Sequence, residues 1–144
     1  MYELIWMSRP LMQAAEANVE QGLRGTGVTV RMRAVLEILH AQGDATVPEI
    51  AHALEIKRQY VQLMVNDTLA DGLVRKIANP RHKRSTLISL TERGRALIEG
   101  VVRREMELVH ALGDDLTTDE VETAHRVVTR LLRGLKSQVQ RPDP

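Results

Sequence analysis

Apolar residues recur at intervals of three and four along most of the chain, the spacing that places them on one face of a helix. This periodicity predicts one short helix after Thr46 and five longer ones. The longer helices are expected over approximately residues 2–23, 30–41, 57–71, 92–112 and 118–138. Residues 73–78 and 86–90 break the pattern and predict two strands, with a turn that begins at Asn79-Pro80.

Helix-capping residues stand at several of these boundaries. Thr29, Thr46 and Thr91 are placed to cap the helices that follow them, and Glu49 has the capping-box spacing after Thr46. Gly72 is suited to the C-terminal end of the fourth helix. These residues support the predicted element order.

Two boundaries stay open at this level. Pro10 lies inside the first predicted helix, so either this helix kinks there or Ser8 caps a helix that starts at Arg9. The last helix begins after either Thr117 or Thr118.

The segment from Thr46 to Thr91 therefore has the order short helix, tight turn, second helix and two strands joined by a basic loop. This order is typical of a winged helix-turn-helix, whose second helix lies in a DNA major groove while the loop reaches a flanking groove. We expect a mainly α (α+β) fold with this lobe over residues 29–91. Residues 2–24 and 92–138 would then form dimerisation helices within one domain that spans residues 1–144.

The last predicted helix carries an apolar stripe that continues along its length. Its members are Val121, Ala124, Val127, Val128, Leu131, Leu132 and Leu135. A chain of 144 residues leaves little for this stripe to cover within one subunit, which favours a homodimer formed by the terminal helices. The alternative is a monomer whose terminal helices fold back on their own core. Two-fold symmetry would place the two recognition helices one DNA turn apart.

Net charge is only +1, but it is distributed unevenly. Residues 1–56 hold 4 Lys/Arg against 7 Asp/Glu, and residues 96–144 hold 7 against 9. Residues 57–95, between them, hold 9 Lys/Arg against 3 Asp/Glu. Basic charge is thus concentrated in the predicted recognition helix and wing, which favours nucleic-acid binding over an evenly solvated surface.

Composition excludes several classes of function. The chain has no Cys, so it has no disulfide, thiolate metal site or thiol redox switch. Aromatic residues make up 2%, too few for a stacking surface for single-stranded nucleic acid. No apolar run approaches the ~20 residues that span a membrane, and residues 1–10 lack the features of a secretory signal. We expect a cytoplasmic protein with no membrane partner.

Three amides on the fourth predicted helix are candidates for reading DNA bases. Gln59, Gln62 and Asn66 share one helical face, and such side chains pair with the major-groove edge of adenine. Lys57 and Arg58 at the helix start are placed to reach a guanine edge or a phosphate. An ordinary solvated helix face is the alternative, which the preceding helix-turn-helix turn disfavours.

The loop after Asn79 has three fixed positive charges, Arg81, Lys83 and Arg84. Basic hairpin tips suit the narrow, electronegative minor groove. Arg84 has a second interpretation, because it could instead pair with Asp67 or Asp71 and hold the wing against the recognition helix.

Two further helix starts are weaker candidates for phosphate contacts. Backbone N–H groups at Thr46 could bind a phosphate, and so could the start of the second helix, with Arg31 and Arg33 nearby.

Residues 71–98 combine a Gly-Leu-Val strand entry, a Pro-containing basic wing, and Leu-Thr-x-x-Gly-Arg at the start of the next helix. With these features as the most specific part, the chain resembles the MarR family of transcriptional regulators over nearly its whole length. The matching residues are Gly72, Leu73, Val74, Pro80, Arg84, Leu90, Thr91, Gly94 and Arg95. Two departures stand out: His82 replaces an acidic wing residue, and Lys57-Arg58-Gln59 replaces early Ser residues.

The resemblance implies a homodimeric repressor or activator that binds a pseudo-palindromic double-stranded operator. It further implies a small-molecule effector between the dimer helices and the DNA-binding lobe, for which the sequence identifies no ligand-binding residues. No cofactor is expected.

Three other functions were weighed. An enzyme is disfavoured, because the five His residues are scattered and no nucleophile elbow, HExxH or phosphate-binding glycine loop is present. A metal-responsive regulator would rest on His110 with Glu107 or His40 with Glu37, a thin ligand set without Cys. A winged helix that does not bind DNA would normally lack such a basic wing, whereas an architectural DNA-binding role without an organic inducer stays open.

Overall fold

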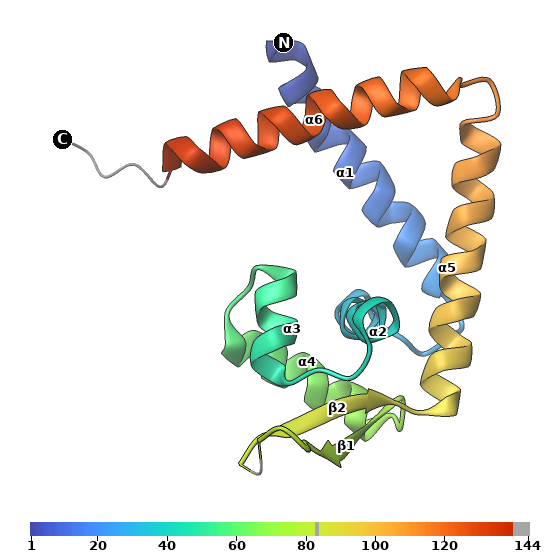
Figure 1. The fold of residues 1–144 in the computed structure, drawn as a ribbon. Helices are drawn as coiled ribbons and strands as arrows, with labels where there is room; N and C mark the ends of the chain where they lie inside the picture. The colour runs from blue at the N-terminus through green and yellow to red at the C-terminus, as the bar shows by residue number, and fades with distance from the viewer. Residues whose placement is uncertain (83, 140–144) are drawn as a thin grey trace. The chain divides into compact units, whose positions relative to one another are not determined.

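The computed structural model describes residues 1–82 and 84–139 and contains six helices and a two-stranded antiparallel sheet among them. The helices are α1 (Tyr2–Leu23), α2 (Val30–Gln42), α3 (Val47–Leu54), α4 (Arg58–Ala70), α5 (Glu92–Leu112) and α6 (Thr118–Val139). The strands are β1 (Val74–Ala78) and β2 (Thr86–Leu90). The prediction of a mainly helical winged helix-turn-helix with flanking helices is confirmed (Figure 1).

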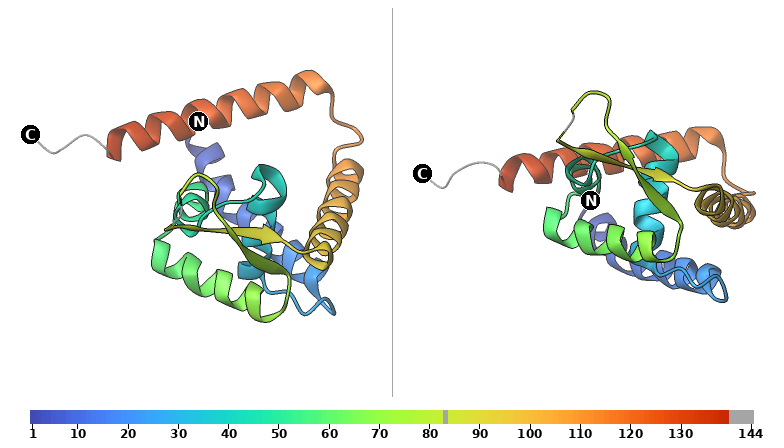
Figure 2. Two further views of the ribbon diagram at one scale, coloured as in Figure 1. Left: turned by 60° about the horizontal axis from the view of Figure 1, so that its bottom comes forward. Right: turned by 90° about the horizontal axis from the view of Figure 1, so that it is seen from below.

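The chain forms two compact units, Met1–Met106 and Glu107–Pro144. In the first unit α2, α3 and α4 gather above the β1–β2 hairpin, and α2 packs against α3, α4 and β2 (Figure 1). The loop between the strands projects beyond these helices, as the right-hand view of Figure 2 shows. This projecting loop is the wing that the sequence predicted.

An aliphatic core holds this unit together. Its fully buried side chains are Val35, Leu36, Ile50, Val61, Val65, Thr68, Leu73, Ile88 and Ile98. They come from α2, α3, α4, the hairpin and α5, so one cluster fixes the recognition helix relative to the wing. The hydroxyl of Thr68, the one polar member, donates to the carbonyls of Met64 and Val65 within its own helix.

The predicted caps form. The side-chain oxygens of Thr29 and Thr46 accept from the backbone N–H groups of Met32 and Glu49, and Glu49 closes a capping box. At the last helix Thr117, rather than Thr118, is the cap, because its hydroxyl pairs with Glu120 in the same way.

The alternative in which the first helix starts at Arg9 is wrong. α1 is continuous from Tyr2 to Leu23 and contains Pro10, and the Ser8 hydroxyl donates to the Ile5 carbonyl 2.5 Å away within that helix. A proline inside a helix removes one backbone hydrogen bond, so the helix can continue where its other bonds persist.

The start of α5 lies against the beginning of the wing at very short range. The Thr91 hydroxyl and backbone N–H both donate to the Leu73 carbonyl at 3.0 Å, and the Gly94 N–H donates to the Thr91 hydroxyl at 3.0 Å. A Cβ at position 94 would lie 1.9 Å from the Leu73 carbonyl oxygen. Only glycine allows this approach, which joins α5 to the start of the β1–β2 hairpin.

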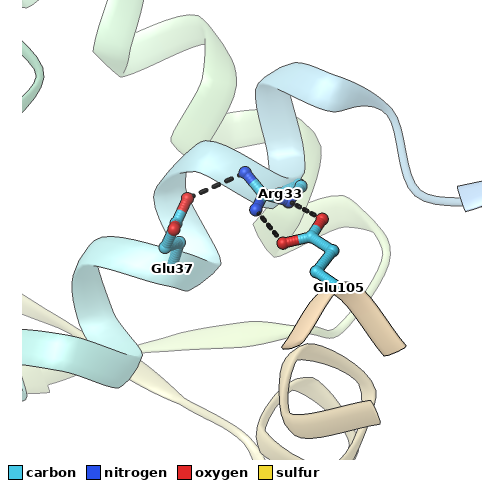
Figure 3. Close-up of polar contacts among 3 residues, drawn as sticks. All are labelled: Arg33, Glu37 and Glu105. Carbon is cyan, nitrogen blue, oxygen red and sulfur yellow. Dashed lines mark hydrogen bonds and ion pairs between the residues drawn. The ribbon is translucent and has the colours of Figure 1, made fainter. Parts of the chain in front are cut away.

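A second contact of α5 is ionic and joins this helix to α2 (Figure 3). The Arg33 guanidinium donates through Nη2 and Nε to both carboxylate oxygens of Glu105, at 2.6 and 3.1 Å. Its Nη1 donates to Glu37 at 2.8 Å. The Arg33 side chain is only 14% exposed, so it serves this joint and is not placed for the phosphate contact considered from sequence.

Large apolar side chains remain exposed on the helices at both ends of the chain. On the first half of α1 they are Tyr2, Leu4, Ile5, Trp6, Met7, Leu11 and Met12. In the second unit they are Leu108, Val109, Leu112, Leu116, Val121, Val128, Leu132, Leu135 and Val139, and α6 has no buried residue. Within the described residues, no helix is both long enough and apolar enough to cross a membrane.

Candidate nucleic-acid interface

A hollow of about 710 Å³ lies between the N-terminus of α3, the exposed face of α4 and the wing. Five of the ten residues predicted to touch DNA line it together: Thr46, Arg58, Gln62, Arg81 and Arg84. They come from three places in the chain, brought to one surface by the packing of α3, α4 and the hairpin against α2.

Charge in this hollow is predominantly positive. Arg58, Lys76, Arg81 and Arg84 are exposed cations that line it. Glu49 is the one acidic side chain among the described lining residues. Sequence reasoning missed Lys76, because a basic residue on a half-exposed strand has no local pattern to mark it. A surface of this kind attracts the phosphate backbone of nucleic acid.

Gln62 is the recognition-helix amide that faces the hollow. Its Nε2 donates to Oδ1 of Asn66, 3.0 Å away, so the two amides form one hydrogen-bonded pair on the exposed face of α4. The pair retains the Gln62 carbonyl oxygen and the Asn66 NH₂ for a base edge, where an acceptor and a donor match adenine. Gln59 and Lys57 are exposed, but neither lines the hollow.

The wing loop is folded by its own short-range hydrogen bonds. The Asn79 side chain accepts from the Arg81 N–H at 2.9 Å and donates to the Ser85 hydroxyl at 2.7 Å. That hydroxyl donates in turn to the His82 carbonyl at 3.1 Å. Asn79 thus orders the loop that presents Arg81. The Asn-Pro pair marked a turn in the sequence, but not this organising role.

The structure does not support Arg84 as a brace for the wing. Arg84 is exposed, lines the hollow and forms no ion pair with Asp67 or Asp71. Among the described residues, the cation that contacts Asp71 is Arg93, whose Nη1 donates to the Asp71 backbone carbonyl at 2.7 Å. The alternative interpretation of Arg84 is therefore wrong, and its guanidinium stays available to a ligand.

Thr46 lines the hollow, but its donors are already used. Oε2 of Glu49 accepts both the Thr46 N–H and the Thr46 hydroxyl at 2.7 Å. A phosphate that bound these donors would have to displace the carboxylate. The Thr46 donors predicted to contact a phosphate are therefore occupied by Glu49 in this structure.

The same contacts hold the pKa of Glu49 below its ordinary value of 4.5. The backbone N–H of Thr46 is the largest cause, its hydroxyl is the next, and the charge of Arg81 adds to them. A lowered pKa means that the capped carboxylate is fully charged at neutral pH. Its contribution to folding is lost as the pH falls through the lowered pKa.

Two other predicted contacts are not found among the residues that line this hollow. Arg31 is exposed on α2 and does not line it. Lys83 lies outside the described residues.

No group of three His, Asp or Glu side chains is placed to hold a metal ion within residues 1–82 and 84–139. The pairs weighed from sequence, Glu107 with His110 and Glu37 with His40, therefore gain no third ligand there.

Comparison with known proteins identifies the architecture. A model of the MarR family matches residues 26–85, which contain α2, α3, α4, β1 and the wing loop but not β2. The crystal structure of a MarR family transcription regulator superposes with a TM-score of 0.89 at 33% sequence identity, covering 98% of this chain and 93% of that one. The chain belongs to the MarR family. Because this is a family of transcription regulators, the prediction that the protein is not an enzyme is also confirmed.

Other proteins match at lower sequence identity. An uncharacterized protein of Mycobacterium tuberculosis is 31% identical over 93 residues, and the match covers 65% of each chain. The transcriptional repressor MdtR of Bacillus subtilis is 25% identical over 127 residues, which cover 88% of this chain and 82% of the repressor. The S. aureus MepR–DNA complex shares the fold, with a TM-score of 0.78 at 23% identity, covering 90% of this chain and 96% of that one.

Proposed function

We propose that this MarR-family protein is a sequence-specific, double-stranded-DNA-binding transcriptional regulator. The observation that carries the proposal is the hollow itself, which places Gln62 next to four cations from α4, β1 and the wing, while Asn66, hydrogen-bonded to Gln62, lies outside the lining. Amides at this position suit base readout in a major groove, and the cations suit the flanking phosphates. The DNA complex of MepR, which shares the fold, supports this assignment.

In this proposal the main DNA-contacting residues come from two places, α4 and the wing. α4 contributes Lys57, Arg58, Gln59, Gln62 and Asn66, and the wing contributes Arg81, Lys83 and Arg84. Thr46 and Arg31 are peripheral, because the first is capped by Glu49 and the second lies outside the hollow.

The protein acts as a homodimer on a pseudo-palindromic operator. Support comes from the apolar side chains exposed on α1 and α6, which a soluble monomer rarely leaves uncovered in such numbers. Two-fold pairing of these helices would present two recognition helices to successive turns of the major groove. A cytoplasmic location follows from this role.

Repression released by a small molecule is the mode of regulation we propose, supported by the similarity to the repressor MdtR. A ligand that changed the spacing of the two recognition helices would release the operator. The second candidate is an architectural DNA-binding role without an inducer, which the same cationic hollow would serve.

Fluorescence anisotropy across a salt series tests the proposal and separates these two roles. The labelled duplexes are the DNA upstream of this protein's own gene and a scrambled duplex of equal length. Tight binding to the first alone, at two chains per site, is expected. Equal and steeply salt-dependent binding to both duplexes would favour the architectural role, after which selection from random DNA would search for another operator.

A further inference from the structure

Glu49 is the exception in a hollow that is otherwise cationic. Its carboxylate lies at the N-terminus of α3, the helix that crosses the DNA backbone in helix-turn-helix complexes. The N-terminus of a helix is normally an anion-binding site, because its backbone N–H groups point outward unpaired. Here a carboxylate of the chain itself already occupies that place.

The contacts of Glu49 hold its charge in position. Oε2 accepts from the Thr46 N–H and hydroxyl at 2.7 Å, and the Glu49 N–H donates back to that hydroxyl at 3.4 Å. Oε1 has no hydrogen bond among the described residues. Arg81, on the wing across the hollow, is near enough for its charge to act on this carboxylate.

We propose that Glu49 limits the affinity of the hollow for DNA, because it occupies the anion site at the start of α3 and partly neutralises Arg81. A phosphate that approaches this part of the hollow meets a fixed negative charge before it reaches the Thr46 donors or Arg81. This penalty comes from the phosphate backbone and is the same for every DNA sequence. Glu49 therefore weakens binding to arbitrary DNA and to the operator by about the same factor, and selectivity is left to Gln62 and Asn66.

The chain supplies a matched control in α6. Glu120 forms the same capping box with Thr117, with distances of 2.8, 2.7 and 3.3 Å, and its pKa is lowered by the same two kinds of hydrogen bond. It does not line the hollow. Glu49→Gln and Glu120→Gln each remove one negative charge. The amide oxygen of the new side chain can still accept the cap hydrogen bonds. Only the first removes it beside the proposed DNA.

The test measures anisotropy of the full-length wild type, Glu49→Gln and Glu120→Gln on the preferred duplex and on a scrambled duplex, in a salt series. For Glu49→Gln we expect roughly fivefold tighter binding to scrambled DNA, the effect of one unit charge about 4 Å from another in a water-like dielectric. The salt slope should steepen by about one unit, as one more phosphate is neutralised. The gain on the preferred duplex should be of similar size, so the ratio of the two affinities stays the same, while Glu120→Gln matches the wild type.

A double-mutant cycle with Arg81→Ala tests whether Glu49 partly neutralises Arg81. If Glu49 acts partly through Arg81, the gain from Glu49→Gln should shrink in the Arg81→Ala background. A gain of equal size in both backgrounds would overturn the neutralisation of Arg81.

The inference rests on the proposed function, and the experiment separates the two. Wild-type protein that binds neither duplex at low salt overturns the proposed function and this inference with it. Wild-type protein that prefers one duplex, with Glu49→Gln indistinguishable from it on both, overturns the role of Glu49 alone. The same changes in Glu120→Gln would also overturn it, since the effect would then not come from the hollow.

Discussion

At the scale of single residues, Gly94 controls how closely α5 approaches the wing. The absence of a side chain at this position lets the first turn of the helix lie against the Leu73 carbonyl. Gly100, in the same helix, has open space around its hypothetical Cβ. Packing therefore requires glycine at position 94 but not at position 100.

We expect Gly94→Ala to lower the free energy of unfolding by about 3 kcal/mol or more, because its Cβ would collide with a backbone oxygen that cannot move alone. Gly100→Ala is the control and should raise it by up to about 1 kcal/mol through better helix propensity. Urea denaturation of both variants measures the difference. Similar stabilities would contradict the close approach.

Gln62 is the residue for which base readout can be tested most directly. Gln62→Ala should cost about 1–3 kcal/mol of binding free energy on the preferred duplex and little on scrambled DNA. The control Gln42→Ala removes an exposed amide from the end of α2, away from the hollow. Anisotropy titration gives both values, and an equal loss on the two duplexes would argue against readout by this amide.

At the scale of elements, the wing loop and the joint between α2 and α5 each depend on specific polar contacts. Asn79 and Ser85 order the wing loop, and the Arg33–Glu105 pair joins α2 to α5. The wing bonds are local in sequence, whereas Arg33 and Glu105 are separated by 72 positions. The two elements therefore depend on interactions of very different sequence range.

The wing should contribute phosphate contacts that do not depend on sequence. Arg81→Ala is expected to weaken binding to preferred and scrambled duplexes alike and to lower the salt slope by about one unit, because one fewer phosphate is neutralised. The control is Arg130→Ala, which removes the same charge from α6, outside the hollow. A slope that stays at the wild-type value would remove Arg81 from the phosphate contacts.

The joint between α2 and α5 should contribute measurably to stability. Glu105→Gln is expected to lower the free energy of unfolding by about 1 kcal/mol, since it weakens a two-point contact with a guanidinium that is largely buried. Glu37→Gln affects an exposed pair four residues apart and should cost less than about 0.5 kcal/mol. Denaturation at fixed protein concentration compares them. A larger loss for Glu37→Gln would contradict this ranking.

At the scale of the whole molecule, the main feature is the set of exposed apolar side chains on the helices at both ends of the chain. α6 is amphipathic. Its apolar stripe contains Val128, Leu132 and Leu135, and its polar face contains Arg126, Arg130 and Arg133. A helix with no buried residue and a continuous apolar stripe gains stability mainly by packing against another surface. The proposed dimer supplies that surface.

Leu131→Asp should therefore convert the dimer into monomers, because it places a charge in the apolar stripe. Arg130→Asp, on the neighbouring polar face, should leave the dimer intact. Sedimentation velocity over a concentration series distinguishes the two. A Leu131→Asp protein that still sediments as a dimer would remove α6 from the interface.

Much of the element order could be predicted, because its signals are local. The boundaries of α2, α5 and both strands fall within about two residues of those expected from periodicity and caps. Thr117 could have been preferred over Thr118 from the start, since Glu120 stands three residues after it. Whether α1 continues through Pro10 could not be decided, because sequence does not show which helix bonds survive a proline.

The sequence by itself determined the winged helix-turn-helix, its basic segment and the amphipathic terminal helices, because each depends on residues a few positions apart. Only the tertiary structure decided which candidates share one surface. It brought Gln62, Arg81 and Arg84 to a common hollow, placed Glu49 among them and assigned Arg33 to the joint with Glu105. These relations depend on how α3, α4, α5 and the hairpin pack around one aliphatic core, and contacts between segments distant in the chain leave no periodicity to read.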